Sequence, residues 1–176
     1  CVKFLQEWAT PLTVVNYILL GMASGFALCT AFAAYVQSDL VNFYGGWAIT
    51  LTVMAFITRS ASLIRNNRIK HKSTLSSAIG IRHTQIQQKA QGAMGGSFNT
   101  REYFHGKKPG FLKSIKWTFL ILVFIVPVLL LSSAIATGSF LIFLLSFLVQ
   151  YTGLIAERWF FFAQANHPQN LYYQTI

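Results

Sequence analysis

Four stretches of the chain are apolar over a length that can cross the hydrocarbon core of a membrane, which takes about 20 helical residues. They are residues 11–36, 46–64, 117–136 and 139–163. Barrel strands would be shorter and would alternate polar and apolar residues, whereas a helix satisfies its own backbone hydrogen bonds. The pattern therefore predicts an all-α fold, a polytopic integral membrane helical bundle. It would form a single membrane domain over residues 1–176 with four transmembrane helices.

Proline and glycine residues add local detail to these four helices. Pro11 is well placed to start the first helix, and the residues at 137–139 make a tight hairpin between the last two. Pro127 lies in the middle of the third helix and is expected to kink it. Gly21 and Gly25 form a G-x-x-x-G pattern in the first helix, which predicts the close approach of another helix.

Charge is scarce and unevenly distributed along the chain. Only 10% of the residues are charged, against about a quarter in soluble domains. Of the 14 lysines and arginines, five Arg and seven Lys lie between Arg59 and Lys116. Because this basic stretch connects two apolar spans, we interpret it as a cytoplasmic loop over residues 65–116 rather than a nucleic-acid site. The loop at 37–44, which carries Asp39 and no Lys or Arg, would then face the other side, and both chain ends would be cytoplasmic.

The basic connector is longer than a link between two helices requires. Residues 73–91 could form a helix on the membrane surface or against a partner, and glycines bound the piece at 92–110. Its aromatic and basic side chains predict a contact surface, with Arg101, Tyr103 and His105 as candidates for partner docking. The alternative is a solvated basic loop that touches lipid.

The sequence holds few residues suited to catalysis or metal binding. Two cysteines give no metal or disulfide spacing, and no zinc pattern or nucleotide-binding motif occurs. A haem held by two histidines would need both inside the bundle. None is expected in this chain, because every histidine lies outside the predicted spans: His71, His83, His105 and His167.

Three ionisable residues lie near the cytoplasmic ends of the second and fourth helices: Arg59, Glu157 and Arg158. Such groups are costly near the bilayer unless they are paired or hydrated. Adjacent helical residues point about 100° apart, so Glu157 and Arg158 are not expected to pair with each other. A Glu157–Arg59 pair is the expected contact. It could lock the bundle, or it could form a polar wall or proton path for a quinone headgroup.

Three strings carry a resemblance to a known family: "FLQEWATPLTVVNYILLGMASGF", "MGGSFNTREYFHG" and "AERWFFFAQANHPQNLYYQ". They resemble the membrane anchor subunits of the dimethyl sulfoxide reductase family, and within it the anchors of cytoplasmic, quinone-linked sulfite dehydrogenases. The resemblance implies an eight-helix, haem-free anchor in the bacterial inner membrane, of which this chain would be the C-terminal half.

The resemblance also implies cofactors and partners. The anchor would bind quinone, either ubiquinone or menaquinone, and would hold an iron–sulfur subunit and a molybdopterin catalytic subunit against the membrane. Electrons would pass between the iron–sulfur clusters of the partner and the quinone. The chain itself would have no catalytic residue. Two alternatives remain open from the residues: half of a transporter, or a structural subunit of a respiratory or photosynthetic complex.

The predicted topology can be tested with thiol labelling in intact cells. A cysteine placed in the connector at 65–116 should stay unlabelled by a membrane-impermeant reagent, whereas one placed in the loop at 37–44 should react. Labelling of the connector from outside would contradict the topology.

Overall fold

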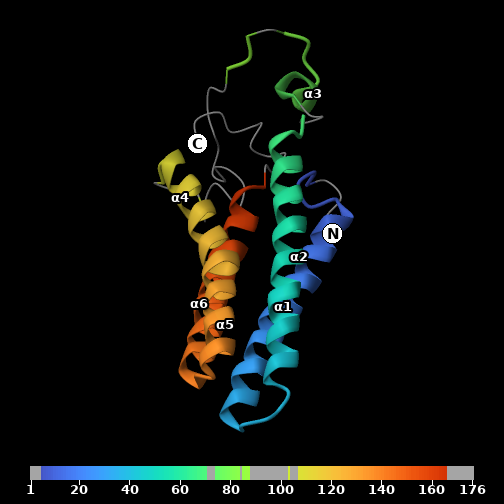
Figure 1. Ribbon diagram of the computed structural model, residues 1–176. Helices are drawn as coiled ribbons and strands as arrows, with labels where there is room; N and C mark the ends of the chain where they lie inside the picture. Colours follow the sequence, from blue (N-terminus) through green and yellow to red (C-terminus); the bar gives the residue numbers. More distant parts are fainter. Residues whose placement is uncertain (1–4, 71–73, 84, 88–102, 104–106, 166–176) are drawn as a thin grey trace.

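The computed structural model describes residues 5–70, 74–83, 85–87, 103 and 107–165, and all regular structure within them is helical (Figure 1). Four helices, the third counted over Gly110–Thr137, are long and apolar enough to cross a membrane. The predicted all-α bundle of four such helices is therefore confirmed. The elements are α1 (Pro11–Tyr35), α2 (Val41–Asn67), α3 (Leu75–Ile79), α4 (Pro109–Leu120), the π-helical turn η2 (Ile121–Ile125), α5 (Val126–Thr137) and α6 (Phe140–Ala163).

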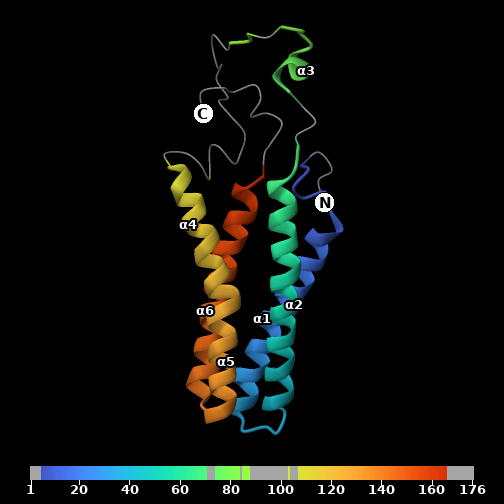
Figure 2. The ribbon, with the colours of Figure 1, turned by 45° about the horizontal axis from the view of Figure 1, so that its top comes forward.

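The long helices form two antiparallel hairpins that pack side by side (Figure 2). The first hairpin is α1 with α2. The second is the continuous rod α4–η2–α5 with α6. The two hairpin loops lie at one end of the bundle, and α3 in the connector lies at the other end (Figure 1).

Two of the four helices extend beyond the apolar stretches from which they were predicted. Helix α2 begins at Val41 and ends at Asn67, and the rod α4–η2–α5 begins at Pro109. Helical hydrogen bonding needs no apolar side chain, so it continues into the polar residues at each end. Thr10 caps α1 through its side chain, which accepts from the Leu12 amide, and Pro11 follows as the first helical residue. Gly138 ends α5 with a φ of 68°.

Small side chains bring α1 and α2 together, but not those of the predicted glycine pair. Ala23 and Ala27 are fully buried. A Cβ added at Gly45 on α2 would lie 3.4 Å from the Thr30 methyl group on α1 and 3.1 Å from the Ile135 side chain on α5. Gly21 and Gly25 instead have no neighbour within 4 Å of an added Cβ. The predicted close packing at these two glycines is therefore wrong within the described chain. They lie on the outward face of α1, while alanines supply the inward face.

The π-helical turn is explained by Pro127. Proline has no N–H to donate, so the carbonyl of Val123, four residues earlier, loses its helical partner. The Gln150 side chain on α6 supplies the missing donor, with Nε2 lying 3.3 Å from Val123 O and 3.1 Å from Thr52 Oγ1 on α2. Ser146 Oγ likewise donates to the Pro127 carbonyl at 3.1 Å. One buried amide thus ties together three elements around the interrupted helix.

Gly153 allows α6 to approach this turn. A Cβ at this position would lie 2.8 Å from Leu122 Cβ and 2.9 Å from the Leu122 backbone carbon. Because backbone atoms cannot rotate away as a flexible side chain can, only glycine fits here without a shift of one helix.

Gly153→Ala is expected to destabilise the protein by about 1–3 kcal/mol, the usual effect of overpacking a core. Gly46→Ala is the matched control, since Gly46 is also in a long helix and has nothing within 4 Å of an added Cβ. It should be neutral or stabilising by up to about 1 kcal/mol. Thermal unfolding in detergent measures both, and equal melting temperatures for the two variants would contradict the close contact.

Candidate functional site

The three predicted ionisable residues come together near the ends of α2 and α6, with Arg59 and Glu157 on the inner faces of these helices. Glu157 follows Gln150 and Gly153 at helical spacing, so it continues the inward stripe of α6. Arg59 lies one turn after the fully buried Ala55 on α2. The side chains of Arg59 and Glu157 are only 2% and 0% exposed, whereas that of Arg158 is 28% exposed. Arg158 therefore lies partly at the surface of the bundle.

Glu157 pairs with both arginines. Its Oε1 lies 2.7 Å from Arg59 Nη2, which confirms the predicted Arg59–Glu157 pair. Its Oε2 accepts from Arg158 Nε and also contacts Arg158 Nη2. The expectation that the adjacent residues would not pair is wrong, because the long arginine side chain reaches the neighbouring carboxylate even though adjacent helical positions point about 100° apart.

Aromatic rings enclose both guanidinium groups. Arg59 Cζ lies 5.7 Å from the centre of the Phe119 ring and 5.9 Å from that of Phe161. Arg158 Cζ lies 3.9 Å from the centre of Tyr17 and 5.3 Å from that of Phe161. Such cation–π contacts stabilise the charge where water is excluded. Phe161 therefore touches both arginines.

Charge and hydrogen bonding within the cluster are incomplete. Two guanidinium groups face one carboxylate, so the three side chains carry one excess positive charge. Among the described residues, Arg59 Nη2 and Glu157 Oε1 meet as an ion pair without forming a hydrogen bond, and Arg59 Nε and Arg158 Nη1 are also buried without a hydrogen-bond partner. Both amide atoms of Asn16 are buried without a partner as well. Asn16 precedes Thr30 by as many residues as Arg59 follows Gly45, and Gly45 faces Thr30, since an added Cβ there would lie 3.4 Å from the Thr30 methyl group. The antiparallel register therefore places Asn16 at the level of Arg59.

Two surface grooves meet beside this cluster. The larger, about 370 Å³, is mostly aromatic, and the smaller, about 180 Å³, includes Arg158. Tyr17 lines both grooves and separates them. The larger is lined by Trp8, Thr13, Val14, Tyr17, Ile18, Phe161 and Phe162, and the smaller by Tyr17, Leu20, Gly21, Leu154 and Arg158.

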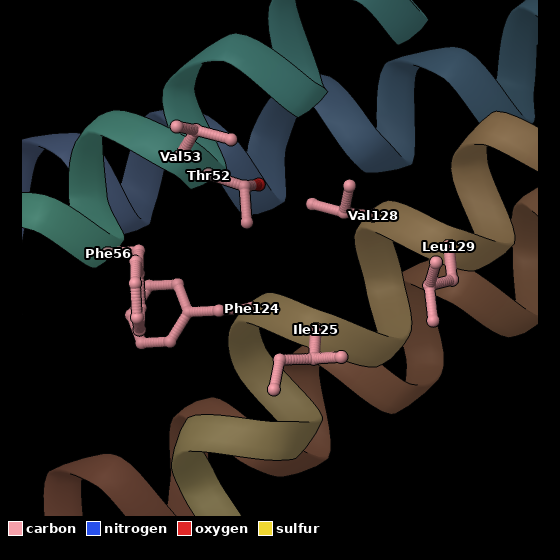
Figure 3. Close-up of a pocket in the computed structure, with 7 residues that line it drawn as sticks. All are labelled: Thr52, Val53, Phe56, Phe124, Ile125, Val128 and Leu129. Atoms are coloured by element: carbon pink, nitrogen blue, oxygen red, sulfur yellow. The ribbon is translucent and has the colours of Figure 1, made fainter.

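Two further grooves lie away from the charges. Figure 3 shows one of about 240 Å³ between α2 and the η2–α5 segment, in which Thr52 is the only polar lining residue. The other, about 510 Å³, lies near the α1–α2 loop and includes Cys29 and Tyr44. Neither is lined by a charged side chain. The ionic cluster thus borders only the α1–α6 grooves among these four.

Of the three docking candidates, the structure describes one. The Tyr103 ring lies 5.5 Å from that of Trp159 and stacks on Phe162 at 6.1 Å, so this part of the connector contacts the end of α6. Arg101 and His105 lie outside the described residues. Within the described part of the chain, no group of three or more His, Cys, Asp or Glu side chains could hold a metal ion.

With this geometry in place, comparison with known proteins adds a functional context. Over 175 residues, the chain is 54% identical to a sulfite dehydrogenase subunit of Allochromatium vinosum, and this match covers 99% of the chain. The chain spans about half the length of that relative, since the match covers 54% of it. No family model matches the chain. No solved structure matches it either.

The relative supports the expected link to sulfite oxidation. Membership of the dimethyl sulfoxide reductase family, the eight-helix architecture and the quinone role stay predictions. No sequence pattern had pointed to Gln150, Thr52 or the aromatic groove. An isolated glutamine within an apolar span was the available signal for the first, because such an amide needs a partner in lipid.

Unequal stability losses are expected when the charges of the cluster are removed singly. Glu157→Gln leaves two guanidinium groups without a counter-ion, and breaking a buried pair in this way costs about 3–5 kcal/mol. Arg158→Gln leaves the neutral Arg59–Glu157 pair intact, so its loss should be smaller. Thermal unfolding of the purified variants measures both losses of stability. An equal or larger loss for Arg158→Gln than for Glu157→Gln would contradict the expected order.

Proposed function

We propose that this chain is part of the membrane subunit of a sulfite-oxidising complex, where it anchors the partner subunits and serves the transfer of electrons to quinone. The observation that carries the proposal is the 54% identity, over nearly the whole chain, to a protein named as a sulfite dehydrogenase subunit. Four helices long and apolar enough to cross a membrane fit the anchoring role.

The chemistry explains why such a complex needs a membrane subunit. Sulfite is a water-soluble anion, whereas quinone is dissolved in lipid. The balanced reaction is SO₃²⁻ + H₂O + quinone → SO₄²⁻ + quinol, in which sulfite gives up two electrons and quinone takes up two electrons and two protons. Oxidation of sulfite would take place on a molybdopterin subunit and electrons would leave it through an iron–sulfur subunit. This chain would supply the lipid-side surface where quinone meets them.

The distribution of charge supports docking of these partners at one end of the bundle. Exposed cations gather around the ends of α2 and α4, for example Arg68, Lys107 and Lys113. The hairpin loops at the opposite end carry neither Lys nor Arg. The cationic end is also the end nearer the Arg59–Glu157–Arg158 cluster, because Arg59 lies eight residues before the end of α2 at Asn67 and Glu157 six before the end of α6 at Ala163. A partner with an acidic surface would bring its electrons close to the cluster.

Of the alternative functions, a transporter half would need interrupted helices at matching places in both hairpins. The interruption at Ile121–Ile125 has no counterpart in α1 or α2, which are continuous α-helices. The structure therefore offers no support for that alternative.

The proposal is tested by purifying the complex through a tag on the full-length protein from its native membrane. We expect iron- and molybdenum-containing subunits to co-purify and the preparation to reduce a soluble quinone analogue when sulfite is added. A protein that purifies with neither metal and shows no sulfite-dependent quinone reduction would contradict the proposal.

A further inference from the structure

We infer that the quinone ring binds in the larger groove between α1 and α6, against Trp8, Tyr17, Phe161 and Phe162. This inference rests on the proposed function and gives it a location. The first support is size. At about 370 Å³, the groove falls within the usual range of small-molecule sites, about 300–1,000 Å³. The groove of Figure 3, at about 240 Å³, is smaller.

The lining suits a flat, apolar ring. Trp8 stacks on Phe161 with their ring centres 5.0 Å apart and nearly parallel planes, and Tyr17 meets Phe161 edge-on at 5.6 Å. Trp8 Nε1 donates to the Phe161 carbonyl at 3.3 Å, which fixes the indole against α6. The aromatic faces are therefore positioned before a ligand arrives, so little ordering is needed on binding.

Charge complementarity distinguishes this groove from the others. The Arg158 guanidinium lies directly over Tyr17 and close to Phe161, two rings of the groove wall. Quinone oxygens carry partial negative charge, and the electrons that the ring accepts add to it. A positive charge held behind the wall in a low-dielectric setting favours both binding and electron uptake. No charged side chain lines the larger α1–α6 groove itself, but Arg158 lies against two of its rings and lines the adjoining smaller groove. The groove near the α1–α2 loop, although about 510 Å³, has no charged lining residue and lies at the other end of the bundle.

Arg59 and Glu157 act as positioning residues in this arrangement. Glu157 holds Arg158 through two contacts, and Arg59 holds Glu157. Neither Arg59 nor Glu157 lines either of the two α1–α6 grooves. The smaller groove continues from Tyr17 toward Leu20 and Leu154 and thus away from the helix ends. It offers an apolar path for the isoprenoid tail toward the middle of the bundle.

The inferred site is tested by substitutions that fill the larger α1–α6 groove with a bulky side chain in the purified complex. Val14→Trp places an indole in it, and Val53→Trp, which enlarges a side chain of similar exposure in the groove of Figure 3, is the matched control. With sulfite as donor, Val14→Trp should raise the KM for a soluble quinone analogue about tenfold or more. Val53→Trp should leave it unchanged. Sulfite-dependent reduction of ferricyanide, which does not need the quinone site, should be equal in both variants.

A second pair of variants tests whether the positive charge of Arg158 contributes to quinone binding. Arg158→Gln should raise the KM for the quinone analogue, whereas Arg158→Lys, which keeps a cation, should recover most of the loss. A purely structural role of Arg158 would instead lower the yield of complex without changing this KM. The Arg158→Gln variant is compared only as assembled complex, checked by its iron and molybdenum content.

The outcomes separate the two proposals. If the unaltered complex reduces no quinone with sulfite, the proposed function fails. If it does so and Val14→Trp has the KM of the unaltered complex, the inferred site is wrong while the function stands. A raised KM in Val53→Trp alone would place the quinone in the groove of Figure 3. Loss of bound phospholipid from Val14→Trp, with an unchanged quinone KM, would identify the groove as a lipid site and overturn the inference.

Discussion

Glu157 lies between two arginines in the interior of a bundle whose outer surface is apolar, and much of the structure depends on that placement. A charge in such a position is tolerated only when an opposite charge meets it. Arg59 comes from the first hairpin and Glu157 from the second, so the pair fixes the position of the two hairpins relative to each other. The same contacts bring Phe161 beside both guanidinium groups. The buried carboxylate therefore links the two hairpins, neutralises one of the arginines and contacts two guanidinium groups that lie beside a ring of the aromatic groove.

The second polar contact inside the bundle obeys the same requirement. Pro127 leaves the Val123 carbonyl without its helical donor, and Gln150 replaces that donor while also binding Thr52 on the opposite hairpin. Gln150, Gly153 and Glu157 lie on one face of α6, at successive turns. That stripe thus supplies a hydrogen-bond donor, a site of close backbone approach and a counter-ion. Polar groups set the alignment of helices whose apolar surfaces alone would allow many packings.

The sequence predicted the parts of this structure that depend on local composition. The four apolar stretches and the Arg59–Glu157 pair followed from hydropathy and from the need to neutralise a charge near lipid. It could not show which face of α1 is inward, so Gly21 and Gly25 were expected to pack and Ala23 and Ala27 do so instead. The Arg158–Glu157 contact depends on how a long side chain folds back, which residue spacing does not reveal. The groove at Trp8 requires residues from both ends of the chain to meet, which no local pattern records.

The two hairpins are joined by the coupling between Arg59 and Glu157, and a double-mutant cycle measures this coupling directly. Arg59→Leu, Glu157→Leu and the double variant are compared by unfolding in detergent. The double variant should be more stable than Glu157→Leu, because it leaves only the partly exposed Arg158 unpaired, and the two single losses should together exceed the loss of the double. Losses that simply add would show that the two residues act independently and would contradict the account.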